Sequence, residues 1–576
     1  MMVRVKRHRF DPWSGMMVAI VTLVCAIIIG LLIIVFGLSF FDGLPGDPDI
    51  NYSLTNYKRI FLDSFTYKVF VNTVAFSIIS LVVAFFFGIP IAWLVERTDF
   101  PGKTLLFTLM TIGLLIPGFM VAMGWVFLLH PRIGIFNQWL MKLLDLHYSL
   151  LNIATIPGMG FVQGLNLAPL AFIMTASVFR SMDPALEEAA QVSGANLRRT
   201  VRLVTVPLIW PGILAAGIYI FTLGFAVFDV PAIIGWSNRI YTFSTYIYLE
   251  VSPQDDLPHY GGAAALSMFV VGLAALLSWW YGSVQGKARR YEVVTGRAYR
   301  PKLIKLGRNV ILAWVLVAAY VLLSKALPLI MLLWASAFPY YMLPSLEALS
   351  HATLVNYRSI PWDLVVRGAK DTGILMLLTP TITVPMSLVF SWVVLRSRLP
   401  GRFVFDFVVF LPHAIPNIIF GVAALLLALF VLQSLVPMYG TVWLLLFIFV
   451  IVRLSYATRM TNSALIQVHQ ELEEAARVSG AGNWSVLRQI LLPILTPTML
   501  YSWLWIALLT YRELTLAIIL STPDNITLPV VVWSIWLQGG LGQASAVTII
   551  LLAFLAPIIA IFWLVVRRTG IIPQEV

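Results

Sequence analysis

The chain has 576 residues, of which 60% are hydrophobic and only 11% are charged. Soluble domains are about 45–50% apolar and about 25% charged, so this composition excludes a soluble globular protein and predicts a membrane protein. The formal net charge of +12 does not indicate nucleic-acid binding, because the basic residues lie between apolar segments and form no aromatic-lined groove.

The chain starts with a basic segment, residues 1–9, and an apolar run follows over residues 16–41. The hydrophobic core of a signal peptide is about 7–15 residues long and leads to a small-residue cleavage site. This run is longer and has no such site, so we predict a first membrane helix that is retained. It contains Cys25, the one cysteine of the chain, which excludes an intrachain disulfide and a cysteine metal site.

A membrane-spanning helix needs about 20 mainly apolar residues, and on this criterion the chain has about 12 spans. The first six are predicted at 16–40, 68–95, 104–129, 161–181, 208–235 and 260–284. The second six are predicted at 309–337, 372–395, 403–432, 441–460, 495–520 and 541–566. Prolines inside spans predict kinks; these are Pro90, Pro117, Pro380, Pro385, Pro412 and Pro416.

One polar phrase occurs twice between the apolar spans. Residues 186–195 read LEEAAQVSGA, and residues 472–481 read LEEAARVSGA, 286 positions later. The dipeptide Asn56-Tyr57 likewise returns as Asn356-Tyr357. With six spans in each half, the two halves cross the membrane in the same direction, as in a parallel repeat. We therefore predict an all-α polytopic membrane protein with two parallel six-helix repeats.

The distribution of basic residues predicts the orientation of the spans. Lys and Arg are concentrated before the first span, between spans six and seven, and after spans eight and twelve. The positive-inside rule places these segments, both termini and both copies of the repeated phrase in the cytoplasm. The residues concerned include Arg4, Lys6, Arg7, Arg9, Arg396, Arg398, Arg402, Arg567 and Arg568.

The repeated phrase is typical of a short helix followed by a sharp turn. Asp183 is a suitable N-cap for a helix that starts at Pro184, and the acidic residues fall in its first turns, where the helix dipole favours them. Gly194 permits the turn, and Pro207 directs the chain back to the membrane. In each copy the pattern is E-A-A-x3-G-x9-I-x-L-P, although the first copy has Val204-Thr205-Val206 before its proline.

This pattern closely resembles the cytoplasmic EAA loop of ATP-binding-cassette (ABC) importer permeases. The chain resembles the fused, twelve-helix permeases of ferric-iron importers, which have the ABC type I importer permease fold. The resemblance implies that each loop docks on a separate ATPase subunit. The docking residues it implies are Glu187, Glu188, Ala189, Ala190, Gly194 and Pro207 in the first copy, and Glu473, Glu474, Ala475, Ala476, Gly480 and Pro493 in the second.

The same resemblance implies how the chain is divided and what it works with. Two ABC transmembrane type-1 domains are expected at 67–284 and 371–566. The remaining segments are an N-terminal tail, helix and external loop (1–66), a basic linker (285–308), the seventh helix with its external loop (309–370) and a tail (567–576). The expected partners are two copies of a cytoplasmic ABC ATPase, a periplasmic binding protein and the lipid of a bacterial inner membrane.

The implied substrate is ferric iron, and thiamine, 2-aminoethylphosphonate and polyamines are the alternatives within the class. The chain itself is expected to bind no cofactor or metal, with ATP and Mg²⁺ on the ATPase. A phosphate-binding loop needs Gly-x4-Gly-Lys-Ser/Thr, and the nearest match, Gly102-Lys103-Thr104, has Arg97 where the first glycine is required. We therefore expect a transport subunit rather than an enzyme.

Two other classes of membrane protein are alternatives to an importer permease. A self-powered secondary transporter with two six-helix halves is expected to carry a basic signature loop after its second span, whereas here the long polar loop follows the fourth. A membrane-embedded enzyme would need paired carboxylates or histidines at one depth, and the sequence shows none.

Ionisable residues at membrane depth are costly and usually mark a pathway or a partner. Arg512 and Glu513 follow Tyr511 inside the predicted span eleven, and Asp229 aligns with Thr515 in the repeat. We consider Asp229, Tyr511, Arg512 and Glu513 as residues of the substrate pathway, the alternative being a structural ion pair. Arg453 is expected to reach outward to the membrane surface.

Overall fold

The computed structural model describes residues 12–42, 51–182, 184–253, 257–288, 303–340, 342–397 and 399–568. The N-terminal basic tail, Asp183, Arg398 and most of the predicted linker lie outside these residues. The described part is mainly helical. It also contains one antiparallel pair of two-residue strands, β1 (Phe41–Asp42) and β2 (Asn51–Tyr52), and an isolated bridge between Thr98 and Ile304.

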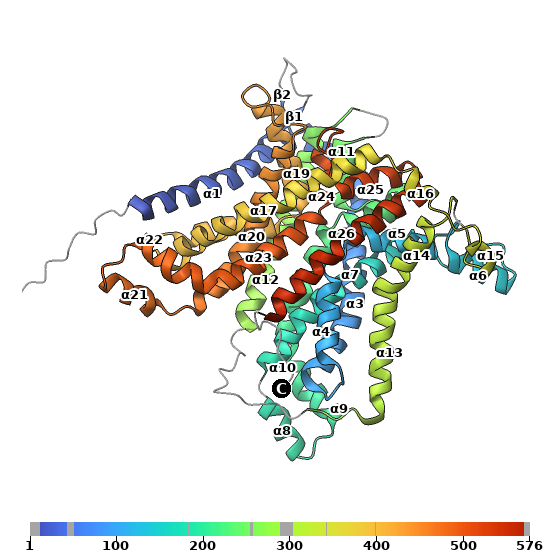
Figure 1. The fold of residues 1–576 in the computed structure, drawn as a ribbon, viewed down its shortest axis with the longest axis horizontal. Helices are drawn as coiled ribbons and strands as arrows, with labels where there is room; N and C mark the ends of the chain where they lie inside the picture. The colour runs from blue at the N-terminus through green and yellow to red at the C-terminus, as the bar shows by residue number, and fades with distance from the viewer. Residues whose placement is uncertain are drawn as a thin grey trace, which may run out of the picture.

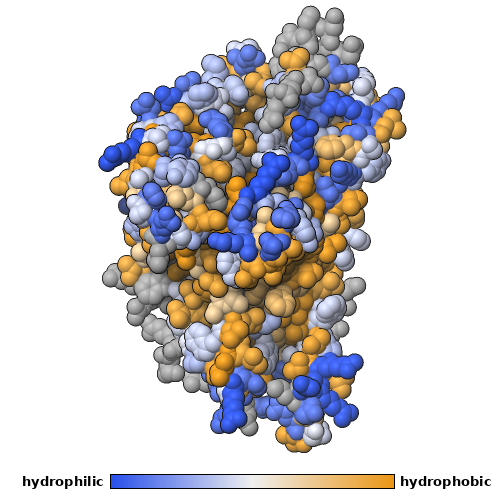
Figure 2. Space-filling view, turned by 90° about the vertical axis from the view of Figure 1, so that its right-hand side faces the viewer, coloured by the Kyte–Doolittle hydropathy of each residue, from blue (hydrophilic) through white to orange (hydrophobic). Residues whose placement is uncertain are grey.

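Ten helical runs in the described part are long and apolar enough to cross a membrane. Seven are single helices: α1 (Pro12–Leu38), α3 (Ser64–Arg97), α7 (Ile156–Ser181), α12 (Tyr260–Ala288), α17 (Trp362–Arg396), α20 (Val442–Gln467) and α26 (Leu541–Arg568). Three continue through a π-helical turn: α9–η1–α10 (Leu197–Ala226), α13–η6–α14 (Val310–Ser336) and α22–η8–α23 (Asn483–Tyr511). Figure 2 shows hydrophobic side chains in a broad band, with hydrophilic side chains above it and at its lower end.

The predicted spans at 104–129 and 403–432 are each a pair of helices, and the kinks predicted at Pro117 and Pro416 are sharp breaks. α4 (Lys103–Gly113) and α5 (Gly118–Leu129) meet at 93°, and α18 (Arg402–Ala414) meets α19 (Asn417–Leu426) with its continuation η7 (Leu427–Leu432) at 101°. Pro117 and Pro416 stand directly before the second helix of each pair. A proline cannot donate the backbone hydrogen bond and forces the residue before it out of the helical region, which explains both breaks.

Two further spans end earlier than predicted. α10 (Val206–Ala226) stops before residue 235, and α23 (Leu492–Tyr511) stops before residue 520. Short elements follow each of them: η2 (Pro231–Gly235) and η3 (Trp236–Asn238) after α10, and α24 (Thr515–Leu520) and α25 (Leu528–Leu537) after α23. Arg512 and Glu513 therefore lie at a helix end and not inside a continuous span.

The asparagines of the repeated Asn-Tyr dipeptides make equivalent hydrogen bonds in both halves. Asn56, on α2 (Thr55–Leu62), donates through Nδ2 to the carbonyl oxygens of Ser39 and Phe41, at 3.2 and 2.6 Å. Asn356, on α16 (Val355–Arg358), donates in the same way to Ser336 and Phe338, at 3.2 and 2.5 Å. Each asparagine thus satisfies the carbonyl groups at the end of the first helix of its half, which would otherwise lack partners.

The first helix of each half packs against the other half. α1 lies against α18 and α19 of the second half, and α14 (Leu327–Ser336) lies against α5 of the first. The approach of α14 is close, since a Cβ added at Gly124 of α5 would lie 2.4 Å from the carbonyl oxygen of Pro328. Glycine is therefore required there, and the two halves form one interlocked bundle.

The short helices lie at the two ends of the bundle. In Figure 1, α8 (Pro184–Val192) and α21 (Gln470–Val478) lie apart from each other at the lower and left-hand end. The strands β1 and β2, together with α6 (Ile135–Leu144) and α15 (Leu346–Leu349), lie at the opposite end. α11 (Phe243–Val251) packs between α12 and α19. Both copies of the repeated phrase therefore lie on one side of the apolar band.

Candidate functional site

The two copies of the repeated phrase fold into two elbows of the same construction. The first elbow comprises α8, a turn at Gly194, α9 (Leu197–Thr200) and η1 (Val201–Thr205). The second comprises α21, a turn at Gly480, α22 (Asn483–Val486) and η8 (Leu487–Leu491). Every element in the second elbow begins and ends 286 residues after its counterpart, so the sequence repeat is also a structural repeat.

Each elbow turns at a glycine in the left-handed region, with φ of +85° at Gly194 and +88° at Gly480. In the second elbow the N–H of Ala481 donates to the carbonyl of Ala476, and that of Gly480 to the carbonyl of Arg477, both at 3.0 Å. These two bonds form a Schellman motif, which ends a helix with a glycine in this conformation.

We predict that Gly480→Ala lowers stability, because an L-residue in the left-handed region costs about 1–2 kcal/mol. Nothing lies within 4 Å of an added Cβ at this position, so the cost comes from the backbone alone. Gly482→Ala is the matched control, since φ is −74° there and the space is equally open. The thermal unfolding temperature of the purified protein should fall for the first variant and stay constant for the second.

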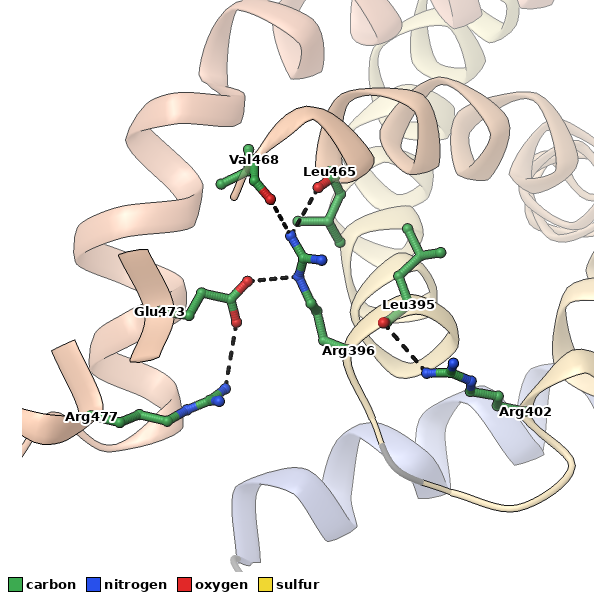
Figure 3. Close-up of polar contacts among 7 residues, drawn as sticks. All are labelled: Leu395, Arg396, Arg402, Leu465, Val468, Glu473 and Arg477. Atoms are coloured by element: carbon green, nitrogen blue, oxygen red, sulfur yellow. Dashed lines mark hydrogen bonds and ion pairs between the residues drawn. The ribbon is translucent and has the colours of Figure 1, made fainter. Parts of the chain in front are cut away.

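An arginine at the end of a membrane span holds the second elbow in place (Figure 3). Arg396, the last residue of α17, donates through Nε to the Glu473 carboxylate at 2.7 Å. Its Nη2 donates to the carbonyl oxygens of Leu465 and Val468, at 2.9 and 2.7 Å. The guanidinium therefore joins the ends of α17 and α20 to the first turn of α21. Glu473 also pairs with Arg477 at 3.4 Å.

The first elbow has the same arrangement with looser distances. Arg97, the last residue of α3, lies 3.6 Å from the Glu187 carboxylate, and its Nη2 donates to the carbonyl oxygens of Phe179 and Met182. Here Thr205 adds a hydrogen bond to Glu187 at 2.5 Å. Both arginines were missed as site residues from the sequence. A sequence feature that could have identified them is their equivalent position in the repeat, since they lie 299 residues apart and each ends a long apolar segment.

The acidic pairs of the repeated phrase are divided between two environments. Glu473 is 2% exposed and faces Arg396, whereas Glu474 is exposed. Glu187 is likewise turned toward Arg97, and Glu188 is half-buried. Ala189 and Ala475 are exposed, and Ala190 and Ala476 are half-buried. The outer surface of the second elbow therefore presents Glu474 and Ala475, and in both elbows the first glutamate faces the anchoring arginine.

Each elbow also exposes apolar side chains at matching positions. Val192 and Val478 are each 89% exposed, and Leu186 and Leu472 are 45% and 49% exposed. These residues lie on α8 and α21, away from the glutamates that face Arg97 and Arg396. A pair of exposed apolar residues at the tip of a rigid helix is typical of a surface that binds a protein partner.

Pro207 and Pro493 lie between the elbows and the next membrane spans and do not interrupt the helix. Each lies near the start of α10 or α23, after a π-helical turn that continues from the short second helix of its elbow. The π turn widens the helix by one residue and accommodates the missing N–H group of the proline. Each elbow is therefore joined to the next span by one continuous helix.

A second polar group lies deep in the bundle where α10 and α23 end. Arg453 of α20 pairs with Glu513 and donates to the carbonyl of Leu509 at 3.2 Å. Arg453 is 3% exposed, so the expectation that it reaches the membrane surface is wrong. Glu513 also accepts from the N–H of Leu516 at 3.2 Å and caps α24. Tyr511 is buried and donates to the carbonyl of Leu551 at 2.8 Å.

The other predicted pathway residues, Asp229 and Arg512, lie beside this pair. Thr515 donates to Asp229 at 3.5 Å, and Arg512 donates to the carbonyl of Leu114 in the break between α4 and α5. Lys325, in η6 (Leu322–Ala326), donates to Oδ1 of Asn166 at 3.3 Å. The sequence did not indicate Lys325 or Asn166, because each lies alone within an apolar segment far from the others along the chain.

The described residues include no group of three or more His, Cys, Asp or Glu side chains that could hold a metal ion. Comparison with known proteins then decides the family. The family described as "Binding-protein-dependent transport system inner membrane component" matches residues 84–290 and 383–570. The chain belongs to this family. It is a multi-pass membrane component of a transport system that works with a substrate-binding protein, and it carries the family domain twice.

Relatives of the chain in this family are similar over most of its length. It is 25% identical over 494 residues to the putative ferric transport system permease protein FbpB 1 of Haemophilus influenzae, covering 84% of this chain and 74% of that one. It is 23% identical to the ferric transport system permease protein FbpB of Actinobacillus pleuropneumoniae, covering 96% and 78%. A shorter match, 29% identical over 25% of this chain and 54% of the other, is the putative 2-aminoethylphosphonate transport system permease protein PhnV of Salmonella typhimurium.

Proposed function

We propose that this chain forms the whole transmembrane pathway of an ABC importer and that two cytoplasmic ATPase subunits drive it through the two elbows. The observation that supports this most directly is the pair of matched elbows at one end of the bundle, each anchored by a buried arginine and each exposing apolar residues. ATP and Mg²⁺ bind to the ATPase subunits in this proposal, and both termini of the chain lie in the cytoplasm with the elbows.

The anchoring of each elbow suits the transmission of a mechanical movement. Arg396 connects Glu473 of the elbow to α17 and to the end of α20, and the continuous helix α22–η8–α23 connects the elbow to the next span. A force applied to α21 by an ATPase therefore acts on three spans together. The first elbow has the corresponding connections to α3, α7 and α10.

We propose ferric iron as the substrate, delivered by a periplasmic binding protein, because the relatives that cover most of the chain bear that name. The shorter similarity to a 2-aminoethylphosphonate permease supports that compound as the second candidate, ahead of thiamine and polyamines. Uptake of ⁵⁵Fe(III) and of ¹⁴C-labelled 2-aminoethylphosphonate by cells that produce the complete transporter distinguishes the two.

The docking of the ATPase is tested by placing a charge on both elbow tips. In the double variant Val192→Asp/Val478→Asp, two carboxylates replace apolar groups that would be buried in the interface, so we expect more than a tenfold loss of co-purifying ATPase. Leu435→Asp is the control, since Leu435 is 73% exposed at the predicted external end. Undiminished co-purification with the double variant, or uptake that continues without the ATPase, would exclude the proposed function and favour a self-powered transporter.

A further inference from the structure

The polar residues around Asp229 and Arg512 lie on the axis that relates the two halves. Asp229 and Thr515 occupy equivalent positions in the repeat, 286 residues apart, and they are hydrogen-bonded to each other at 3.5 Å. In an arrangement with twofold pseudosymmetry, a residue that contacts its own counterpart lies at the axis. In a transporter built from two parallel repeats, the substrate pathway follows the interface at that axis.

Broken helices surround this position. Gly113 and Gly118 flank the break between α4 and α5, and the carbonyl of Leu114 inside the break accepts from Arg512. A Cβ added at Gly118 would lie 3.4 Å from Nδ2 of Asn166 and 3.7 Å from Oδ2 of Asp229, so both side chains reach the same point above the glycine. A Cβ added at Gly113 would lie 3.8 Å from Cε of Lys325. Non-helical backbone at membrane depth is tolerated where it lines a cavity or a ligand site.

The polar groups here retain unused hydrogen-bonding capacity. Nδ2 of Asn166 is buried and has no partner among the described residues. Lys325 makes one hydrogen bond through an ammonium that can donate three, and Arg512 makes one through a guanidinium that can donate five. Asn166, Asp229, Lys325 and Arg512 are all partly exposed although they lie inside the bundle. Asn166 lies against Gly118, Lys325 against Gly113 and Arg512 against Leu114, so all three border the same helix break. Their unused donors indicate a ligand there that accepts hydrogen bonds.

The charges at this position do not balance. Glu513 is paired with Arg453, which leaves Lys325, Arg512 and Asp229, two cations and one anion. No opposite charge lies within 4.0 Å of Lys325 or Arg512 in the described part of the chain. Asp229 lies beside Gly118 at the N-terminus of α5, where the helix dipole compensates a carboxylate. The excess positive charge in a medium of low dielectric attracts an anion and repels a bare cation.

We propose that Asn166, Lys325 and Arg512 form a binding site for an oxyanion, with Asp229 beside it, and that the substrate passes this site with net negative charge. The inference rests on the proposed import function and makes the substrate class more specific. One source of the oxyanion is an anion that chelates ferric iron and crosses with it. The other is a free organic oxyanion such as a phosphonate, whose amino group would face Asp229.

The test uses the complete transporter in proteoliposomes, with ATP inside and the loaded binding protein outside. The probes are ⁵⁵Fe(III) loaded together with ³³P-phosphate, and ¹⁴C-labelled 2-aminoethylphosphonate. The variants are Lys325→Met and Arg512→Lys, since the first removes a charge and the second keeps the charge but changes the geometry. Lys370→Met removes a cation from an exposed position on α17 and is the control. ATP hydrolysis stimulated by the loaded binding protein is measured in parallel.

If ⁵⁵Fe and ³³P accumulate together, the oxyanion is one that crosses with ferric iron. If 2-aminoethylphosphonate accumulates alone, the oxyanion is the free phosphonate. We expect one of these two results. Lys325→Met should lower the accumulation more than tenfold while stimulated ATP hydrolysis persists, and Arg512→Lys should have a smaller effect. One result would overturn the oxyanion site and leave the proposed import function intact. In that result ⁵⁵Fe accumulates without ³³P, and Lys325→Met accumulates as much ⁵⁵Fe as the wild type or more. If the wild-type complex accumulates no probe and shows no stimulated hydrolysis, the proposed function is wrong and the inference with it.

Discussion

Replacing Arg396 by methionine should reduce substrate uptake by more than tenfold, because the change separates the second elbow from two membrane spans. The variant removes the donor to Glu473 at 2.7 Å and those to Leu465 and Val468. It also leaves the Glu473 carboxylate, 2% exposed, with Arg477 at 3.4 Å as its remaining partner, so we expect a loss of stability smaller than the about 3–5 kcal/mol of a buried charge with no partner. The measurement is substrate accumulated per ATP hydrolysed by the complete transporter.

Two controls separate the loss of coupling from a loss of folding. Arg402→Met removes a nearby exposed arginine that donates to the carbonyls of Leu395 and Ser397, and uptake should remain normal. Arg396→Met combined with Glu473→Leu removes both charges, so stability should recover while uptake stays low. Normal coupling in that double variant would show that the arginine merely neutralises the glutamate. Arg97→Met should have a smaller effect, because Arg97 is 3.6 Å from Glu187 and Thr205 also binds that carboxylate.

Replacing Arg453 by methionine should destabilise the folded protein by about 3–5 kcal/mol, because Glu513 would stay buried without its ion pair. The two side chains are 3% and 8% exposed. The measurement is the thermal unfolding temperature of the detergent-purified protein, together with the yield of correctly inserted chain.

The matched control lies on the same helix. Arg459 of α20 pairs with Asp406 at 3.3 Å, but its side chain is 44% exposed, and an exposed pair contributes only about 0–1 kcal/mol. Arg459→Met should therefore leave the unfolding temperature almost unchanged. In the double variant Arg453→Met/Glu513→Met, most of the lost stability should return. Equal unfolding temperatures for Arg453→Met and Arg459→Met would contradict a structural role for the buried pair.

The sequence predicted the membrane fold and the elbows because both depend on local patterns. Long apolar segments define spans by themselves, and the repeated phrase contains its own helix start, its turn glycine and its acidic residues. The breaks at Pro117 and Pro416 were expected only as kinks, since a sequence shows where a helix is interrupted but not by what angle it turns. The angles of 93° and 101° depend on which helices the second segment meets.

The anchors and the axial polar group could not be predicted, because each depends on contacts between distant segments. Arg396 was considered only as a basic residue at a cytoplasmic span end, and its partner Glu473 is 77 residues away. Arg453 and Glu513 lie 60 residues apart, and Lys325 and Asn166 lie 159 apart. Nothing in the local sequence of Lys325 distinguishes it from a lysine that extends to the membrane surface. Only the packing of helices that are distant in the sequence brings these groups together.

The interlocked first helices also constrain how the protein is made. The groove on α5 around Gly124 is filled by α14, which the ribosome synthesises about two hundred residues later. Until then that groove faces lipid or an insertion factor, and the first half is incomplete as a folding unit. A gene encoding only residues before 310 should therefore give an unstable product. Because both halves are joined in one polypeptide, α14 is produced in a one-to-one ratio with α5 and close to the groove that it fills.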